Sequence, residues 1–251
     1  MKKLMDFLIT LWVWFLIPLL TVLVTIPISL LSTLFSPLDP QRKWAHRVGV
    51  FWGKAIIGAN LRWKLQINGR QHIKSGQSYV VISNHASMTD IMILYNLGMQ
   101  FKWLAKSSLF KIPFLGWNMS LMQYIPLERG RHGSIRKSYH KAKEWLKQGM
   151  SVLIFPEGTR SRDGSLSEFR NGAFKMAIEL QKPILPIVLF GTEKTIPKGQ
   201  WLVGPRIKMS LSVLPPVETK DYDPNDFEKL KNTVHDLMRK EIERKRLSLN
   251  A

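Results

Sequence analysis

The sequence predicts an α/β protein with a mostly parallel central sheet flanked by helices and preceded by an N-terminal helical membrane element. From about residue 61 onward, short apolar runs alternate with amphipathic stretches, which is the pattern of strands joined by helices in a parallel sheet. Before that point, the segment between Asp6 and Asp39 contains no charged residue. The chain has 251 residues, which is enough for one α/β domain and a small additional element.

Composition restricts the classes of function. Lys and Arg number 37 against 18 Asp and Glu, which gives a formal net charge of +19. Such a charge attracts anions, which include nucleic acid, an anionic membrane surface and phosphorylated substrates. The chain has no cysteine, which excludes a disulfide framework, a thiol nucleophile and cysteine-ligated zinc.

The uncharged segment predicts a membrane-associated element within residues 1–60, with residues 61–251 forming the α/β domain. Its 32 residues would extend about 48 Å as a straight helix, more than a hydrocarbon core of about 30 Å requires. The run is too long for a secretory signal, and no small-residue cleavage site follows it. Pro18 and Pro27 interrupt it, and basic residues flank both ends. These features favour a re-entrant hairpin over a single tilted span, and the second alternative stays open.

The next stretch has apolar residues at helical spacing, with Trp44, Val48, Trp52 and Ile56 on one face. Several Lys and Arg residues lie close by. The pattern is typical of a basic amphipathic helix on lipid headgroups. A helix packed on the core of the following domain explains it equally well.

The remaining elements follow from the apolar runs in chain order. Strands are predicted over residues 78–83, 101–105, 123–127, 151–155, 184–190 and 207–214. Helices are predicted over residues 91–97, 135–146, 172–181 and 227–242. Loops at residues 84–90, 156–161 and from 191 onward each follow an apolar strand directly. If those strands are parallel, the loops meet at one edge of the sheet, where α/β proteins bind ligands.

The first of these loops contains a histidine and an aspartate that are five residues apart, His85 and Asp90. On one straight helix they would be rotated by about 140° from each other, so they meet only if His85 lies in the turn before the helix. A carboxylate that accepts one ring N–H leaves the other ring nitrogen free to take a proton. No G-x-S-x-G motif is present, so a substrate hydroxyl would be the nucleophile. Ser87 and Asp90 also have the spacing of a capping box, which is the structural alternative.

The second loop carries fixed positive charge after a Pro-Glu-Gly turn, with Glu157 followed by Arg160. The planar guanidinium of arginine suits a phosphate, because it donates two parallel hydrogen bonds. Lys106 and Arg129 each follow a predicted strand and are further candidates for contact with an anion. A solvated polar turn and surface lysines and arginines are the alternatives for these residues.

The same residues resemble the ordered sequence blocks of the glycerolipid acyltransferases, and among them the bacterial 1-acylglycerol-3-phosphate acyltransferases. The resemblance covers about residues 61–215 and rests mainly on its first and third blocks. Met88 stands where an aromatic residue is common, and Ser107 and Ser108 replace an acidic residue of the family. The matching blocks are Asn84-His85-x-x-x-x-Asp90, Tyr-Ile-Pro-Leu-Glu-Arg129, Phe-Pro-Glu157-Gly158-Thr159-Arg160-Ser161 and Lys-Pro-Ile-Leu-Pro186-Ile-Val.

The resemblance implies a catalytic acyltransferase domain and assigns roles to its residues. His85 is expected to be the general base and Asp90 its partner. The acceptor, 1-acylglycerol 3-phosphate (lysophosphatidic acid), is expected to receive an acyl chain from acyl-CoA or acyl-carrier protein on its sn-2 hydroxyl, which makes phosphatidic acid. No metal and no further cofactor are expected, and the cytoplasmic side of the inner membrane is the expected location. The substrate-binding residues are expected to be Lys106, Arg129, Glu157, Gly158, Thr159 and Arg160.

Three other interpretations compete with this one. A lipid hydrolase would need water or a protein nucleophile in place of the acceptor, and the missing G-x-S-x-G motif argues against it. A membrane-tethered nucleic-acid binder would explain the charge, but no zinc knuckle, basic zipper or RRM-type aromatic motif is present, so nucleic acid is not expected as a partner. A different lysophospholipid or polyol-phosphate acceptor, with the same chemistry, is the strongest alternative.

Overall fold

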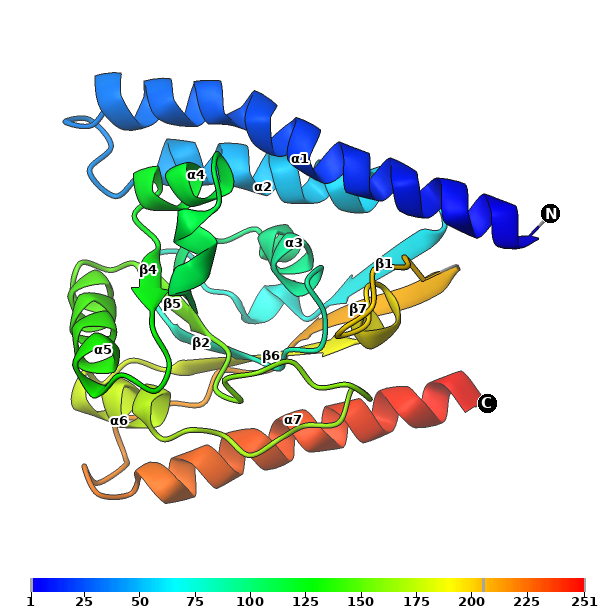
Figure 1. The fold of residues 1–251 in the computed structure, drawn as a ribbon. Coiled ribbons are helices and arrows are strands. Elements are labelled where there is room, and N and C mark those ends of the chain that lie inside the picture. Colours follow the sequence, from blue (N-terminus) through cyan, green and yellow to red (C-terminus); the bar gives the residue numbers. More distant parts are fainter. Residues whose placement is uncertain (1, 205, 251) are drawn as a thin grey trace.

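The computed structural model describes residues 2–204 and 206–250, over which the chain forms a seven-stranded sheet covered by helices on both faces (Figure 1). The strands are β1 (Trp63–Asn68), β2 (Val80–Ser83), β3 (Phe101–Lys106), β4 (Ile125–Leu127), β5 (Ser151–Ile154), β6 (Ile184–Phe190) and β7 (Ile207–Val213). The α-helices are α1 (Lys2–Leu34), α2 (Lys43–Ala59), α3 (Asp90–Leu94), α4 (Leu115–Leu121), α5 (His132–Lys147), α6 (Gly172–Glu179) and α7 (Phe227–Asn250).

The sheet has the strand order β1-β7-β6-β2-β5-β3-β4. Every neighbouring pair is parallel except β6 and β7, which run antiparallel. The predicted α/β fold with a mostly parallel sheet is therefore confirmed. Among the described strands and α-helices, β1 and α4 are additions to the predicted set.

The central strands are buried on both faces, which explains their continuous apolar sequences. In β2, Val80 and Ile82 belong to the apolar cluster under α5, α6 and α7, whereas Val81 belongs to the cluster on the opposite face, as does Tyr79 just before the strand. Successive side chains of a strand point to opposite faces, so each cluster receives alternate residues. Figure 1 shows α1 to α4 on one side of the sheet and α5 to α7 on the other.

The N-terminal run forms one continuous helix of 33 residues, α1, in place of the expected re-entrant hairpin. The helix continues through Pro18 and Pro27, and the chain reverses only after Leu34. A proline removes one backbone hydrogen bond, and packing of α1 against α2 and α4 offsets that loss. Among the described residues, α1 is the one helix that is long and apolar enough to cross a membrane by length and composition.

The two long faces of α1 have different surroundings. Its inward side chains, which include Val13, Val24 and Ile28, belong to the apolar cluster on the upper face of the sheet. Its outward side chains repeat at helical spacing and stay exposed, and we call them the outward stripe: Leu4, Leu8, Leu11, Phe15, Leu19, Val22, Ile26 and Leu30.

The α2 helix packs on the core of the domain, which is one of the two alternatives that its sequence left open. His46, Gly49, Gly53 and Ile56 are buried in the core below the helix. Phe51 on the opposite side is 61% exposed. The helix is therefore packed on the domain along one face and presents an apolar side chain to the surroundings on another.

A chain of buried polar groups connects α2 to the sheet. His46 Nδ1 lies 3.0 Å from the hydroxyl of Tyr124, which lies 2.8 Å from the hydroxyl of Tyr95. Burial, with a smaller contribution from Lys102, lowers the pKa of His46 to about 3, so its ring is neutral. Buried polar groups that bond to one another fix the relative positions of the elements that carry them.

The closest approach between α2 and α3 depends on Gly53. A Cβ at this position would lie 2.8 Å from Tyr95 Cδ2 and 3.0 Å from the Met92 carbonyl oxygen. We expect Gly53→Ala to force α2 away from α3 and to destabilise the fold by about 1–3 kcal/mol, the usual cost of overpacking. Thermal unfolding of the detergent-solubilised protein measures this change.

Gly58, on the same helix, provides the matched control. A Cβ there would meet no heavy atom within 4 Å. Gly58→Ala is expected to raise stability by up to about 1 kcal/mol, because alanine favours the helix. Equal unfolding temperatures for the two variants would contradict the described packing of α2.

Candidate active site

Three loops meet at one edge of the sheet, as the sequence predicts. The strands β6, β2 and β5 are adjacent and parallel, so their carboxyl ends lie side by side. The loop after β2 carries His85, the loop after β5 carries Arg160, and the loop after β6 carries Lys198. Side chains from distant parts of the sequence therefore meet at this edge.

His85 and Asp90 form a direct pair. His85 Nδ1 lies 2.7 Å from Asp90 Oδ2. The Asp90 side chain is completely buried, whereas that of His85 is 18% exposed. With Nδ1–H donated to the carboxylate, Nε2 is the ring nitrogen that accepts a proton. The pair therefore has the geometry of a general base that is oriented by a carboxylate.

Asp90 has a second function in the same place. Its Oδ2 also accepts hydrogen bonds from the backbone N–H groups of Ala86 and Ser87, at 2.7 and 2.9 Å. These bonds shape the turn that precedes α3, as a capping residue does. The reciprocal bond of a capping box is absent, because α3 begins at Asp90 and Ser87 Oγ accepts from the N–H of Thr89. Asp90 therefore pairs with His85 and bonds the turn, but Ser87 does not cap the helix.

The imidazole of His85 is held from a second direction. The ring of Phe155 stacks on it, with ring centroids 4.1 Å apart and an interplanar angle of 18°. The backbone of His85 is also bonded on both sides, because its N–H donates to Glu157 Oε1 and its carbonyl accepts from the N–H of Ser161. These contacts join the loop after β2 to the loop after β5.

Glu157 and Gly158 support this arrangement from behind the cavity wall. The Glu157 carboxylate accepts the N–H of His85 at 2.8 Å and the N–H of Ser167 at 2.9 Å. Burial raises the pKa of Glu157, although these two hydrogen bonds oppose that rise. Gly158 has a φ of +72°, and a Cβ there would lie 2.8 Å from Arg170 Nε. Neither Glu157 nor Gly158 lies in the lining of the cavity next to His85, so the contact with substrate expected of them stays a prediction.

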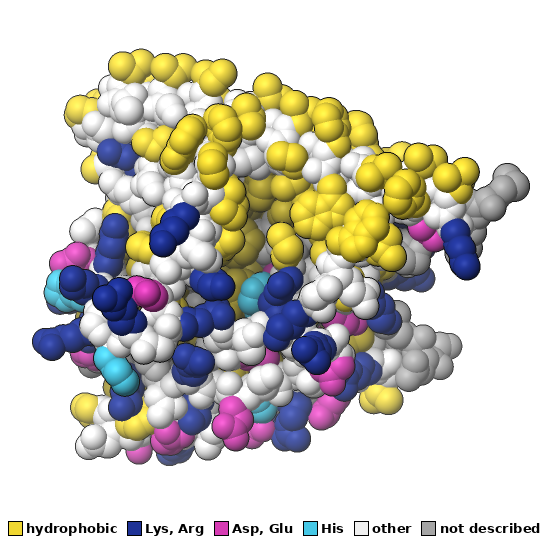
Figure 2. All heavy atoms as spheres, viewed as in Figure 1, with side chains coloured by type: hydrophobic (Ala, Val, Ile, Leu, Met, Phe, Trp, Pro, Cys, Tyr) yellow, Lys and Arg dark blue, Asp and Glu magenta, His cyan; other side chains and the backbone are white. Residues whose placement is uncertain are grey.

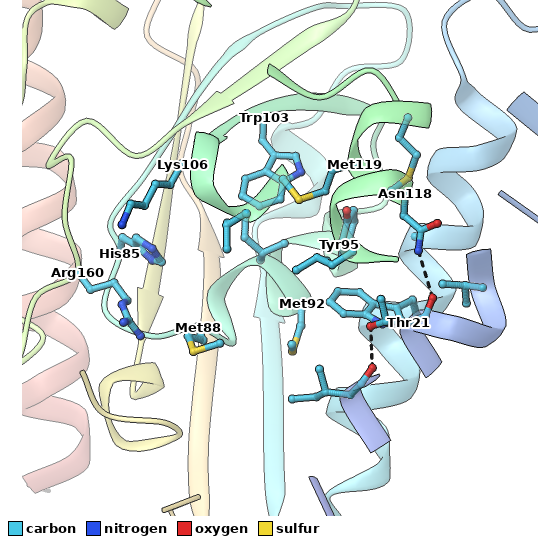
Figure 3. A pocket seen from close by; sticks show the side chains of 18 of the residues that line it. Thr21, His85, Met88, Met92, Tyr95, Trp103, Lys106, Asn118, Met119 and Arg160 are labelled. Atoms are coloured by element: carbon cyan, nitrogen blue, oxygen red, sulfur yellow. Dashed lines mark hydrogen bonds between the residues drawn. The ribbon is translucent and has the colours of Figure 1, made fainter. Parts of the chain in front are cut away.

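A cavity of about 440 Å³ opens beside His85. Its size falls within the usual range of small-molecule sites, about 300–1,000 Å³. Figure 3 shows His85, Lys106 and Arg160 together at one end of this cavity, with Met92, Tyr95 and Met119 farther in. The cavity therefore has a cationic mouth and an apolar interior.

The mouth of the cavity brings four of the predicted binding residues together, namely Lys106, Arg129, Thr159 and Arg160. Partial burial lowers the pKa of Arg129, and the nearby charge of Arg170 lowers it further. Crowded positive charges repel one another, so an anion between them is stabilised.

Lys198 is a member of the mouth that no sequence motif indicated. Its Nζ donates to Thr159 Oγ1 at 3.1 Å and to the Arg160 carbonyl oxygen at 2.9 Å. The sequence placed the loop after β6 at this edge of the sheet but singled out no residue in it. Only the folding of that loop against the Thr159–Arg160 turn reveals the contact.

The interior of the cavity is built largely from the N-terminal helices and the elements below them. The α1 helix contributes one wall, α2 contributes Gly49 and Trp52, and α4 contributes Met119. At the end away from His85, the amide of Asn118 donates to the Thr21 carbonyl oxygen at 3.2 Å (Figure 3). The lining residues from α1 are Ile17, Thr21, Val24 and Ile28.

The described part of the chain contains no evident metal-binding site. No group of three or more His, Asp and Glu side chains comes together there with the arrangement of a metal site.

Comparisons with known proteins agree with this geometry. Residues 64–190 match the sequence model of the Acyltransferase family. A chloroplast 1-acyl-sn-glycerol-3-phosphate acyltransferase of Arabidopsis thaliana is 40% identical over 167 residues, which are 66% of this chain and 46% of that protein. A protein of the same name from Limnanthes douglasii is 32% identical over 199 residues, which are 76% of this chain and 69% of that protein. The chain thus spans about half the length of its Arabidopsis relative.

A solved structure matches the whole fold. The crystal structure of the 1-acyl-sn-glycerophosphate acyltransferase PlsC from Thermotoga maritima superposes with a TM-score of 0.85. The two sequences are 27% identical, and the match covers 98% of each chain. The family match over half of the sequence and the shared fold confirm the resemblance seen in the sequence blocks, and the chain belongs to the acyltransferase family.

Proposed function

We propose that this protein transfers an acyl chain from an acyl thioester to the sn-2 hydroxyl of 1-acylglycerol 3-phosphate, which produces phosphatidic acid. The observation that carries the proposal is the His85–Asp90 pair at the cationic mouth of an apolar cavity. An acceptor that combines a phosphate, a free hydroxyl and an acyl chain matches these three features. The names of the relatives support the same acceptor.

The reaction begins with proton transfer to His85. Nε2 accepts the proton of the acceptor hydroxyl while Asp90 stabilises the resulting imidazolium. The hydroxyl oxygen forms a bond to the thioester carbonyl carbon, and the tetrahedral intermediate expels the thiolate. The thiolate takes the proton back from His85, so the enzyme returns to its starting state without a covalent intermediate.

The acceptor phosphate binds at the mouth of the cavity. Lys106 at the end of β3 and Arg129 and Arg160 in the loops after β4 and β5 surround this position. Lys198 holds the Arg160 turn in place. Charge-assisted hydrogen bonds from these side chains fix the phosphate, which places the hydroxyl next to His85. The apolar interior holds an acyl chain.

Membrane association follows from the position of α1. The helix contacts the domain along much of its length, since Asp6 pairs with Arg62 and Ile28 lies in the cavity wall. The outward stripe stays free for lipid. We therefore propose that the helix lies against one leaflet. The basic residues near both of its ends support a position of the active site on the cytoplasmic side of the inner membrane.

The proposed function is tested with purified protein and a panel of lysophospholipids. We expect lysophosphatidic acid to be acylated at the sn-2 position with acyl-CoA or with acyl-carrier protein as donor, as measured by mass analysis of the product lipids. Preferential acylation of a lysophospholipid that lacks the terminal phosphate would contradict the proposed acceptor. Steady release of free fatty acid without any acceptor would indicate a hydrolase.

Replacement of the general base is expected to stop the reaction. His85→Ala should lower turnover by about 10²–10⁴-fold, the usual contribution of a positioned base. The exposed His132 provides the control, and His132→Ala should leave turnover unchanged. Circular dichroism and flotation with vesicles check that both variants fold and bind membranes. Near-normal turnover of a folded His85→Ala protein would refute the base assignment.

Removal of a phosphate contact is expected to act on the acceptor. Arg160→Ala should raise the acceptor KM by about tenfold or more, because a charge-assisted hydrogen bond is worth about 1.5–3 kcal/mol. Arg162→Ala is the matched control, since Arg162 is exposed and lies outside the cavity lining. Initial rates at varied acceptor concentration separate KM from kcat. An unchanged KM in Arg160→Ala would remove this residue from the phosphate site.

A further inference from the structure

A loop beside the cavity exposes two large apolar side chains. This segment, residues 196–203, lies between the short 3-10 helix Thr192–Lys194 and β7, and we call it the rim loop. Its two ends are buried, with Ile196 at 1% and Val203 at 3% exposure. Between them, Trp201 is 52% exposed and Leu202 is 49% exposed. Their exposure therefore occurs in a loop that is fixed at both ends.

The tip of the rim loop is attached to α1. The indole N–H of Trp14 donates to the Trp201 carbonyl oxygen at 2.7 Å. The N–H of Val203 donates to Thr10 Oγ1 at 3.1 Å. The rings of Phe7 and Trp201 meet edge to face, with centroids 6.1 Å apart. These contacts hold the two exposed side chains next to the N-terminal half of α1.

The exposed side chains continue an apolar surface. Phe7 and Trp12 of α1 are themselves 43% and 49% exposed, and the outward stripe extends from them along the helix. Ile112 and Trp117, which flank the cavity-lining Leu115, are exposed as well. Figure 2 shows hydrophobic side chains over the upper part of the molecule and around the hollow, with Lys and Arg side chains gathered below them.

The same loop also reaches the acceptor site. Lys198, three residues before Trp201, donates to Thr159 and to the backbone of Arg160. A hydrogen bond from the N–H of Gln200 to the Pro197 carbonyl oxygen closes the turn between these residues. Trp201 is therefore connected to the turn that carries Arg160 through a short segment with its own hydrogen bonds.

We propose that Trp201 and Leu202 enter the lipid bilayer and form a membrane contact separate from α1, so that the rim loop connects the membrane surface to the phosphate-binding turn. An ordered surface loop with an exposed Trp-Leu pair is costly in water, and tryptophan is the residue that best suits the boundary between headgroups and acyl chains. The continuity of the pair with the outward stripe identifies the bilayer, and not a protein partner, as the occupant. The connection between the rim loop and the phosphate-binding turn, which we call the coupling, rests on the proposed function. The contact of Trp201 and Leu202 with lipid does not.

The chain contains no cysteine, so one introduced cysteine can be labelled selectively. We expect Leu202→Cys, labelled with a polarity-sensitive fluorophore, to show blue-shifted and stronger emission with vesicles of equal parts phosphatidylethanolamine and phosphatidylglycerol. The control is Lys220→Cys, an exposed position in the connection between β7 and α7. Its label should show no shift with the same vesicles.

Two outcomes would overturn the proposed contact. One is the absence of any spectral change at position 202 while flotation shows that the protein is bound to vesicles. The other is a spectral change without vesicles that grows with protein concentration, which would show that a second copy of the chain covers the loop. The labelling experiment requires no turnover, so its result is independent of whether the acceptor has been identified correctly.

The coupling is tested with Trp201→Ala and the conservative variant Trp201→Phe. We expect Trp201→Ala to raise the apparent KM several-fold for acceptor embedded in vesicles and to leave KM unchanged for a short-chain acceptor in free solution. Trp201→Phe should restore most of the lost affinity. Equal losses with both forms of acceptor would show that Trp201 supports only the fold of the loop, and the coupling would be refuted.

Discussion

The structure depends on the three hydrogen bonds that converge on one oxygen of Asp90. This atom accepts from His85 Nδ1 and from the N–H groups of Ala86 and Ser87. It thereby fixes the tautomer of the imidazole, the path of the turn after β2 and the start of α3. Because the carboxylate is completely buried, water cannot replace any of these bonds. The same carboxylate that orients the proposed general base thus also holds the local fold.

The central fold was predictable because its strands are buried on both faces. Continuous apolar runs such as β2 and β6 are visible without any knowledge of their neighbours. The edge strand β1 was not predicted, although Trp63, Leu65 and Ile67 alternate with polar residues as a half-buried strand requires. The hairpin expected in the N-terminal run was wrong, since packing along α1 outweighs the effect of Pro18 and Pro27.

The candidate site was predictable where its residues lie at or shortly after the carboxyl end of a strand, as His85, Lys106 and Arg160 do. The sequence could not distinguish a side chain in the cavity wall from one behind it. Glu157 lies in the same motif as Arg160, yet its carboxylate is bonded to the backbone of His85 and Ser167. Lys198 stands outside every motif and depends entirely on tertiary contacts. The spacing of residues in a sequence thus identifies which loops form a site, but it does not show in which direction each side chain points.

The two faces of α1 have a consequence for protein engineering. Val24 and Ile28 enclose the cavity from one side of the helix, while Leu19 and Ile26 are exposed on the other. A truncation that removes the helix to obtain a water-soluble enzyme would therefore open the cavity to solvent, so α1 is more than a detachable tether. Solubilising redesign has to keep the inner residues and alter only the exposed ones.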